Sequence, residues 1–137
     1  MTYRLEFTID GLPPILSNGP HSKWYYSHGV KKKWKQATIF AIGRKKPRAP
    51  LLKAKCTFIR VSSNQPDDDN LRISFKAIRD ALVECGVLVN DKPHNMPDPK
   101  YIWEKGKPKA GHIKVIVEEI KSDNPKTFIN IKEAVSE

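Results

Sequence analysis

The strongest constraint on the fold lies between Asp67 and Gly86, where acidic residues open the clearest helical pattern of the chain. The apolar residues of this segment recur at helical spacing, as Leu71, Phe75, Ile78, Leu82 and Cys85. Such a stripe predicts an amphipathic helix with one face in a core. Asp69 is a suitable N-cap residue, and Gly86 stands where a glycine commonly ends a helix.

Alternating apolar and polar residues predict strands around this helix. Residues 3–9 and 53–61 alternate clearly, and residues 87–89, 101–103 and 112–120 are the other expected strands. A first helix is expected from about residue 30 to residue 44. The order β-α-β-α-β-β-β predicts one small α/β domain over residues 1–137, in which a mixed sheet carries two main helices.

The remaining segments are expected to be connections. Residues 15–30 are predicted to form a polar loop with the aromatic cluster Trp24-Tyr25-Tyr26, and residues 105–109 a basic hairpin tip between two strands. A polar tail begins at about residue 121, with a last helical turn expected near residues 131–135.

Charge is distributed unevenly along the chain. The whole chain has a formal net charge of +10, whereas residues 66–91 contain six acids and three bases. A surplus of Lys and Arg is the usual electrostatic footprint of a nucleic-acid-binding protein. The alternative is that the surplus serves only solubility and nonspecific association.

Other classes of protein find little support in the composition. No apolar run approaches the ~20 residues that a membrane helix requires, and the first residues lack the apolar stretch of a signal peptide. We therefore expect a cytoplasmic protein without membrane contact. Cys56 and Cys85 are expected to be buried free thiols, because no pair of cysteines has the spacing of a zinc or redox motif.

Three aspartates are candidate metal ligands. Asp67 and Asp69 are two residues apart, so their carboxylates point to the same side of an extended segment. Asp91 ends the short apolar strand after the helix, and a chain that folds back there would bring it toward the helix start. Mg²⁺ prefers such oxygen ligands, often together with substrate phosphate. The alternatives are a helix cap with its dipole partner for the first two, and an ordinary turn residue for Asp91.

Lys76 has two interpretations of equal weight. Asp80 follows it by four residues, so an ordinary ion pair along one helix face accounts for both. In the functional interpretation, Lys76 lies beside a scissile phosphate and stabilises charge in the transition state.

Several basic residues are candidates for binding DNA. The lysines at the start of the first helix gain nothing from the helix dipole, which suggests an external anion, although a solvated charge run explains them equally well. The candidate set is Lys31, Lys32, Lys33, Arg72, Lys105, Lys107 and Lys109. Trp24 and Tyr25 could stack on unpaired bases, the alternatives being core packing or a dimer contact.

Three motifs together resemble the RusA family of Holliday-junction resolvases. They are Pro66-Asp67-Asp68-Asp69-Asn70-Leu71, Lys76-Ala77-Ile78-Arg79-Asp80-Ala81-Leu82 and Gly86-Val87-Leu88-Val89-Asn90-Asp91. The early Leu12-Pro13-Pro14 with Ser17-Asn18 also resembles the N-terminal segment of that family. Two features depart from the family pattern. Lys76 stands about three residues further from the Asp-Asn-Leu motif than usual, which makes Arg72 a competing candidate, and Asn90-Asp91 replaces a pair of aspartates.

The resemblance implies a small homodimeric endodeoxyribonuclease of phage or prophage type that cuts branched DNA, especially four-way junctions. It implies Mg²⁺ or Mn²⁺ bound by Asp67, Asp69 and Asp91, with Lys76 as the catalytic lysine. A catalytically inactive relative that binds DNA for regulation is the main alternative. A basic RNA-binding module would explain the charge but not the aspartates.

Overall fold

The computed structural model describes residues 3–13 and 24–121, with the backbone alone for residues 24–28. The expected turn near residues 131–135, the Ser17-Asn18 motif and the side chains of Trp24 and Tyr25 lie outside the described part. No helix within that part is long and apolar enough to cross a membrane.

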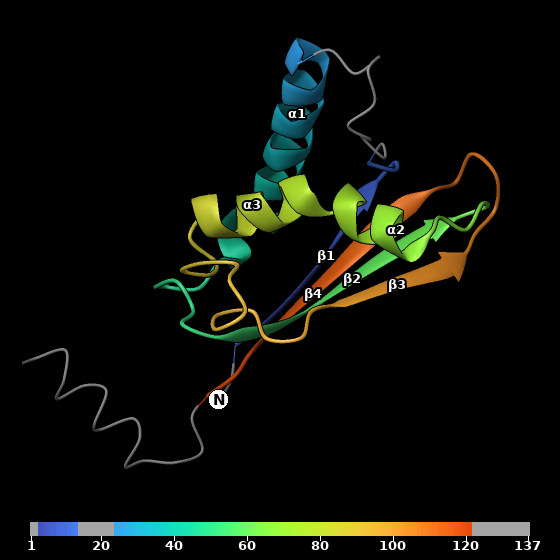
Figure 1. Ribbon diagram of the computed structural model, residues 1–137. Helices are drawn as coiled ribbons and strands as arrows, with labels where there is room; N and C mark the ends of the chain where they lie inside the picture. Colours follow the sequence, from blue (N-terminus) through green and yellow to red (C-terminus); the bar gives the residue numbers. More distant parts are fainter. Residues whose placement is uncertain (1–2, 14–23, 122–137) are drawn as a thin grey trace, which may run out of the picture.

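The described residues form a mixed sheet, as the sequence predicts, with four strands where five were expected. Its strands are β1 (Arg4–Asp10), β2 (Ala54–Ser62), β3 (Lys100–Lys105) and β4 (His112–Glu119). Their order in space is β1-β4-β2-β3 (Figure 1). Strand β4 is antiparallel to both β1 and β2, and β3 runs parallel to β2.

The predicted hairpin between the last two strands is wrong, because β2 separates β3 from β4 in the sheet. Strand β3 packs beside β2 through a stacked contact between Phe58 and Tyr101, whose ring centroids are 5.2 Å apart. Trp103 Nε1 also donates a hydrogen bond to Ser62 Oγ at 2.9 Å. These contacts hold β3 parallel to β2. The basic segment after β3 therefore crosses the end of β2 to reach β4.

Helix α1 (Trp24–Ile42) begins earlier than predicted, and a short 3-10 turn (Gly43–Lys45) follows it. The aromatic cluster at its start is therefore helical rather than part of a loop. Nothing between residues 24 and 30 breaks a helix except Gly29, which costs only about 1 kcal/mol relative to alanine. Trp34 and Ile42 are buried, so the helix packs through one face.

The long predicted helix is divided into α2 (Asp68–Ser74) and α3 (Lys76–Glu84). Phe75 lies between them with φ −97° and ψ 5°, outside helical geometry. Its ring is fully buried, 5.2 Å from the ring of Phe58 and 6.2 Å from that of Tyr101. Seating this ring against the sheet accounts for the break. Most of the predicted stripe still faces the core, since Leu71, Ile78 and Leu82 are also buried.

The strand predicted at residues 87–89 does not form. Leu88 makes a single parallel bridge to Leu51 instead. Leu51 donates its N–H to the Val87 carbonyl at 2.9 Å, and Val89 donates to the Leu51 carbonyl at 3.0 Å. Val87 and Leu88 are buried as expected, but Val89 is 40% exposed, and the partner is one loop residue rather than a strand. Gly86 has φ +89°, the left-handed conformation expected where a helix ends.

All three helices lie on one face of the sheet (Figure 1). The core between helices and sheet contains Leu5, Phe7, Phe58, Phe75, Ile78, Leu82, Ile113, Val115 and Val117. Alternate residues of the strands point to the opposite face, where Arg4, Glu6, Lys55 and Glu118 are exposed. The acidic start of α2 and Lys76 at the start of α3 therefore face solvent, with the packed core beneath them.

Candidate functional site

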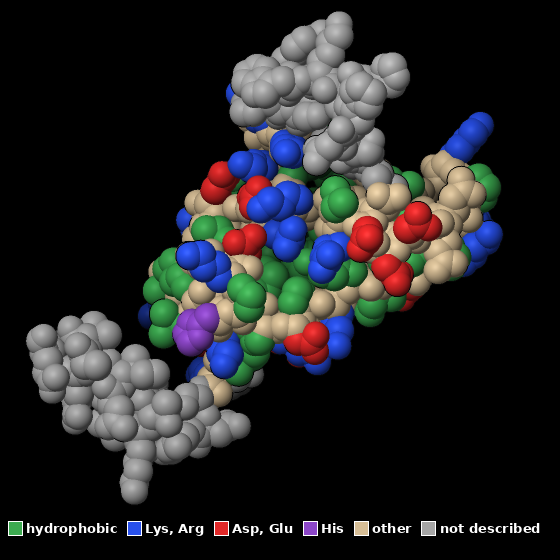
Figure 2. Space-filling model, in the orientation of Figure 1, with side chains coloured by type: hydrophobic (Ala, Val, Ile, Leu, Met, Phe, Trp, Pro, Cys, Tyr) green, Lys and Arg blue, Asp and Glu red, His purple; other side chains and the backbone are tan. Residues whose placement is uncertain are grey.

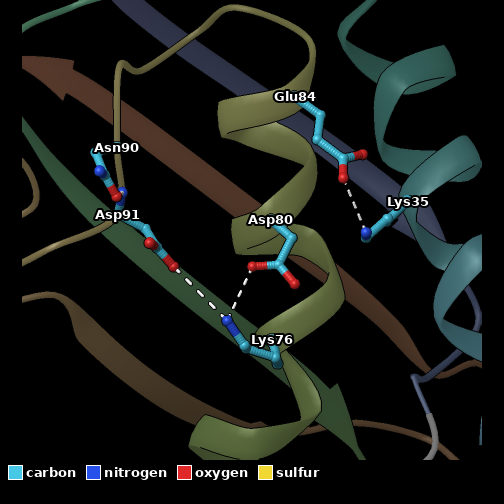
Figure 3. Close-up of polar contacts among 6 residues, drawn as sticks. All are labelled: Lys35, Lys76, Asp80, Glu84, Asn90 and Asp91. Atoms are coloured by element: carbon cyan, nitrogen blue, oxygen red, sulfur yellow. Dashed lines mark hydrogen bonds and ion pairs between the residues drawn. The ribbon is translucent and has the colours of Figure 1, made fainter.

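Lys76, the first residue of α3, lies between two carboxylates (Figure 3). Its Nζ is 2.9 Å from Oδ1 of Asp80, one turn along the same helix. The same atom is 4.0 Å from Oδ2 of Asp91, which belongs to the segment after α3. One cation therefore links two separate stretches of the chain.

The path of the chain after α3 brings Asp91 to this position. Gly86 turns the chain out of the helix, and Val87 and Leu88 anchor it because both side chains are buried. Asn90 then accepts the N–H of Asp91 on its side-chain oxygen at 2.8 Å. The chain folds back along α3, so that residue 91 arrives beside the first residue of that helix.

The cluster of Lys76, Asp80 and Asp91 is partly open to solvent. The side chain of Lys76 is 50% exposed, whereas those of Asp80 and Asp91 are 29% and 25% exposed. Two carboxylates around one ammonium leave a formal charge of −1. Ion pairs at this exposure contribute about 0.2–1 kcal/mol to stability. Folding therefore gains little from these charges, and the ammonium remains accessible to a ligand.

The acidic residues before Leu71 form a second group at the start of α2. Asp67 occupies the N-cap position, so the prediction that Asp69 caps the helix is wrong. The helix begins one residue before Asp69, and Asp67 has the extended backbone that a cap residue requires, although its side chain makes no capping hydrogen bond. Asp68 and Asp69 fall in the first turn, where the helix dipole favours negative charge. Figure 2 shows acidic side chains gathered over this end of α2, with basic side chains nearby.

Asp69 is a solvent-facing residue. Its side chain is 88% exposed, and its Oδ1 lies 3.8 Å from the guanidinium of Arg72. Arg72 is itself 61% exposed, so this pair is loose. Arg72, the competing candidate for the role of Lys76, thus pairs with Asp69 at the start of α2, while Lys76 pairs with Asp80 and Asp91.

The expected cluster of Asp67, Asp69 and Asp91 is not assembled. Within residues 3–13 and 24–121, no three His, Cys, Asp or Glu residues are grouped so that they could hold a metal ion. Six residues separate Asp69 from Lys76, the last of them Phe75 at the helix break, and Asp91 pairs with Lys76. Carboxylates suit Mg²⁺ chemically, and in the described part of the chain these three are not gathered at one point.

A further ion pair fixes α3 against α1. Lys35 Nζ lies 2.9 Å from Oε1 of Glu84, at the end of α3 opposite Lys76 (Figure 3). The hydrogen bond to Glu84 raises the pKa of Lys35, opposed by a smaller effect of burial. This contact orients the helix whose first residue is Lys76.

The basic candidates lie on two other segments. Lys31, Lys32 and Lys33 are exposed on α1, and Lys107 and Lys109 are exposed on the connection after β3. Lys105 donates to the carbonyl of Ser63 at 3.1 Å, which ties that connection to the end of β2.

One residue of this region was missed as a functional candidate. Asp80 was predicted only as an ion-pair partner, yet it makes the shorter of the two contacts with Lys76. Its spacing of four residues from Lys76 was the available signal.

Fold and site together define a basic α/β protein with two acidic groups at a pair of short helices. One group lies at the start of α2, and the other, Asp80 and Asp91, pairs with Lys76. No protein-family model matches this chain, and no curated protein matches it.

Proposed function

We propose that this protein is an endodeoxyribonuclease that hydrolyses phosphodiester bonds near the branch point of four-way DNA junctions. The proposal rests on the resemblance of its three motifs to the RusA family of Holliday-junction resolvases. The observation that carries it is the contact of Asp91 with Lys76, 4.0 Å between Oδ2 and Nζ. The resemblance assigns both residues to one active site, and they come from different segments of the chain.

The charge of the protein supports a nucleic-acid substrate. A net charge of +10 on 137 residues favours association with a polyanion at low salt. Residues 66–91 hold six of the fifteen acids but only three of the twenty-five Lys and Arg, so the rest of the chain carries the positive charge that would meet phosphates.

Lys76 is the residue proposed to act on the phosphate. Its ammonium is half exposed and is held by Asp80 and Asp91, so its position is set before a substrate arrives. A positioned cation stabilises the negative charge that develops on phosphate oxygens in the transition state. The two carboxylates are proposed to position the lysine, and Asp80 joins the candidate site for this reason.

Dependence on Mg²⁺ or Mn²⁺ is part of the proposal that rests on the resemblance alone. Asp67, Asp69 and Asp91 supply oxygen donors of the right kind, and a divalent ion would polarise the phosphate and activate water. The three carboxylates are not grouped within the described residues, so their role as metal ligands rests on the resemblance. Homodimerisation likewise follows from the expectation that symmetric cutting needs two active sites.

The test compares a synthetic four-way junction with a linear duplex containing the same sequences, in Mg²⁺, in Mn²⁺ and in EDTA. We expect paired nicks at symmetric positions in the junction with either ion, little cutting of the duplex, and no product in EDTA. A junction that is bound but uncut under all three conditions would contradict nuclease activity.

The second candidate is a protein that binds branched DNA without cutting it. One observation favours it, since Asp69 and Lys76 both take part in ion pairs with neighbours on their own helices, Arg72 and Asp80. The acidic residues at the start of α2 would then stabilise the helix, and Lys76 would form ordinary ion pairs. The same experiment separates the two candidates, because only the nuclease releases products.

A further inference from the structure

A groove lies between α1, the end of β1 and the connection that leads into β4. It consists of two cavities of about 500 and 360 Å³ that share residues 10–12 as a common wall. Lys109 lines the larger cavity and Lys33 the smaller one. None of Lys76, Asp80 and Asp91 lines either cavity, so the groove is a separate feature of the surface.

The floor of this groove is built from closely paired backbone. Gly11 donates its N–H to the Gly111 carbonyl at 2.9 Å, which joins the end of β1 to the start of β4. Gly11 has φ +96°, a conformation that other residues rarely adopt. A Cβ at position 111 would lie 2.6 Å from Cγ of Leu12, so only glycine fits there without movement. The groove is therefore a fixed part of the fold.

Lys109 occupies this site at an energetic cost. Its φ is +66°, in the left-handed region where a residue with a β-carbon loses roughly 1–2 kcal/mol. Glycine or asparagine would adopt that conformation more readily. Lys109 adopts this backbone in the turn after β3, and the turn brings the residue to the wall of the larger cavity.

The two lysines of the groove are uncompensated by the rest of the described chain. Neither Lys33 nor Lys109 forms an ion pair with a residue in ranges 3–13 and 24–121, although Asp10 lines both cavities. Additional exposed lysines continue the positive charge along both sides, as Lys31, Lys32 and Lys107. Charge on both sides of an open groove fits an extended polyanion better than a small neutral ligand.

We propose that this groove binds the phosphodiester backbone of one DNA strand, with Lys33 and Lys109 contacting phosphates from opposite sides. The assignment rests on the proposed function and adds a strand-binding site apart from Lys76. It joins two basic segments that are distant in the sequence into one interface. The apolar side chains of Leu12 and Val30 line the groove beside the lysines and offer contact to the sugars.

The experiment measures binding of a fluorescent four-way junction by anisotropy in EDTA, over a series of salt concentrations. The test protein carries Lys33→Gln and Lys109→Asn, the latter chosen because asparagine tolerates the left-handed backbone. The control carries Lys53→Gln and Lys55→Gln, which remove two exposed lysines at the start of β2. The groove lies near the other end of that strand, where β2 pairs with the start of β4. Both proteins lose the same formal charge.

We expect the test protein to bind about 10-fold more weakly than the unmodified protein. Its plot of log affinity against log salt should be shallower by roughly 1.8, because each phosphate contact contributes about 0.9 to the slope. The control should bind within about twofold of the unmodified protein. Thermal unfolding should show that Lys109→Asn is at least as stable as the unmodified protein, and the single change Lys33→Gln provides a second folded test.

Two results would overturn the groove assignment while leaving the proposed function intact. The first is unchanged affinity and salt slope in the test protein, and the second is an equal loss in the control, which would indicate a diffuse effect of charge. A failure of the unmodified protein to bind the junction at all would instead overturn the proposed function together with the groove.

Discussion

Asp91 lies beside Lys76, with 4.0 Å between Oδ2 and Nζ, although one residue follows α3 and the other begins it. The contact exists because Gly86 ends the helix and the buried Val87 and Leu88 return the chain along it. An arrangement that gains little stability, yet requires a specific chain path, is more consistent with a functional role for the lysine than with a structural one.

Replacing Lys76 with glutamine should slow junction cutting roughly 100-fold or more, the effect of removing one donor from a developing negative charge. Stability should change by less than about 1 kcal/mol, because the lysine is half exposed. Single-turnover cleavage and urea unfolding measure the two effects. Lys100→Gln is the matched control, since Lys100 is 52% exposed and pairs with Asp98 at 3.0 Å. Equal losses in both variants would remove the special role of Lys76.

Replacing Asp69 with asparagine should abolish cutting, because the resemblance makes its carboxylate a ligand of the catalytic metal. Junction binding should stay the same or become tighter, because a negative charge near phosphate is removed. Gel-shift titration in EDTA and cleavage in Mg²⁺ separate binding from hydrolysis. Asp98→Asn is the control, as the Asp98 side chain is 81% exposed against 88% for Asp69. Weaker binding by the Asp69 variant would indicate a structural residue instead.

Replacing Phe75 with alanine should destabilise the protein by about 3–5 kcal/mol, the range for truncating a buried aromatic side chain. Its ring is fully buried against Phe58 and Tyr101, at the residue that lies between α2 and α3. Urea unfolding measures the loss. Phe40→Ala should have little effect, because Phe40 is 88% exposed. A loss below about 1 kcal/mol for Phe75 would contradict the described core.

Cys56 should make the protein less stable at alkaline pH. Burial raises the pKa of this thiol from 9.0 to about 12. The unfolded thiol ionises first as pH rises, so the unfolded state binds fewer protons and stability falls between pH 9 and 12. The slope contributed by this one group is about 1.4 kcal/mol per pH unit. Unfolding of Cys56→Ala across that range should show a smaller loss. An equal loss in both proteins would mean that burial does not raise the pKa of Cys56 above that of the unfolded chain.

Strand positions were predictable because the alternation of side chains reports burial directly. Ala54, Cys56 and Phe58 alternate in the sequence and are all fully buried in β2. Strand order was not predictable in the same way. Whether β3 pairs with β2 or β4 depends on contacts between distant residues, such as the stacking of Phe58 on Tyr101. The basic segment 105–109 contains glycine and proline and lies between two strands, so its local sequence alone predicts a hairpin.

The candidate site was predictable in its parts rather than in its assembly. The pairing of Lys76 with Asp80 follows from helical spacing, and the return of Asp91 follows from the glycine and the apolar run after the helix. The helix break was not visible, because Phe75 fits the apolar stripe perfectly well as a helical residue. That break places the acids at the start of α2 and Lys76 at the start of α3 on two separate helices.

The most direct test of the account is cleavage of a four-way junction in Mg²⁺ by the unmodified protein and by Asp91→Asn, with binding measured in parallel. We predict symmetric paired nicks by the unmodified protein, and loss of nicking by Asp91→Asn at unchanged junction affinity. Nicking by Asp91→Asn at the rate of the unmodified protein, or no nicking by either, would contradict the assignment of Asp91 and Lys76 to one active site.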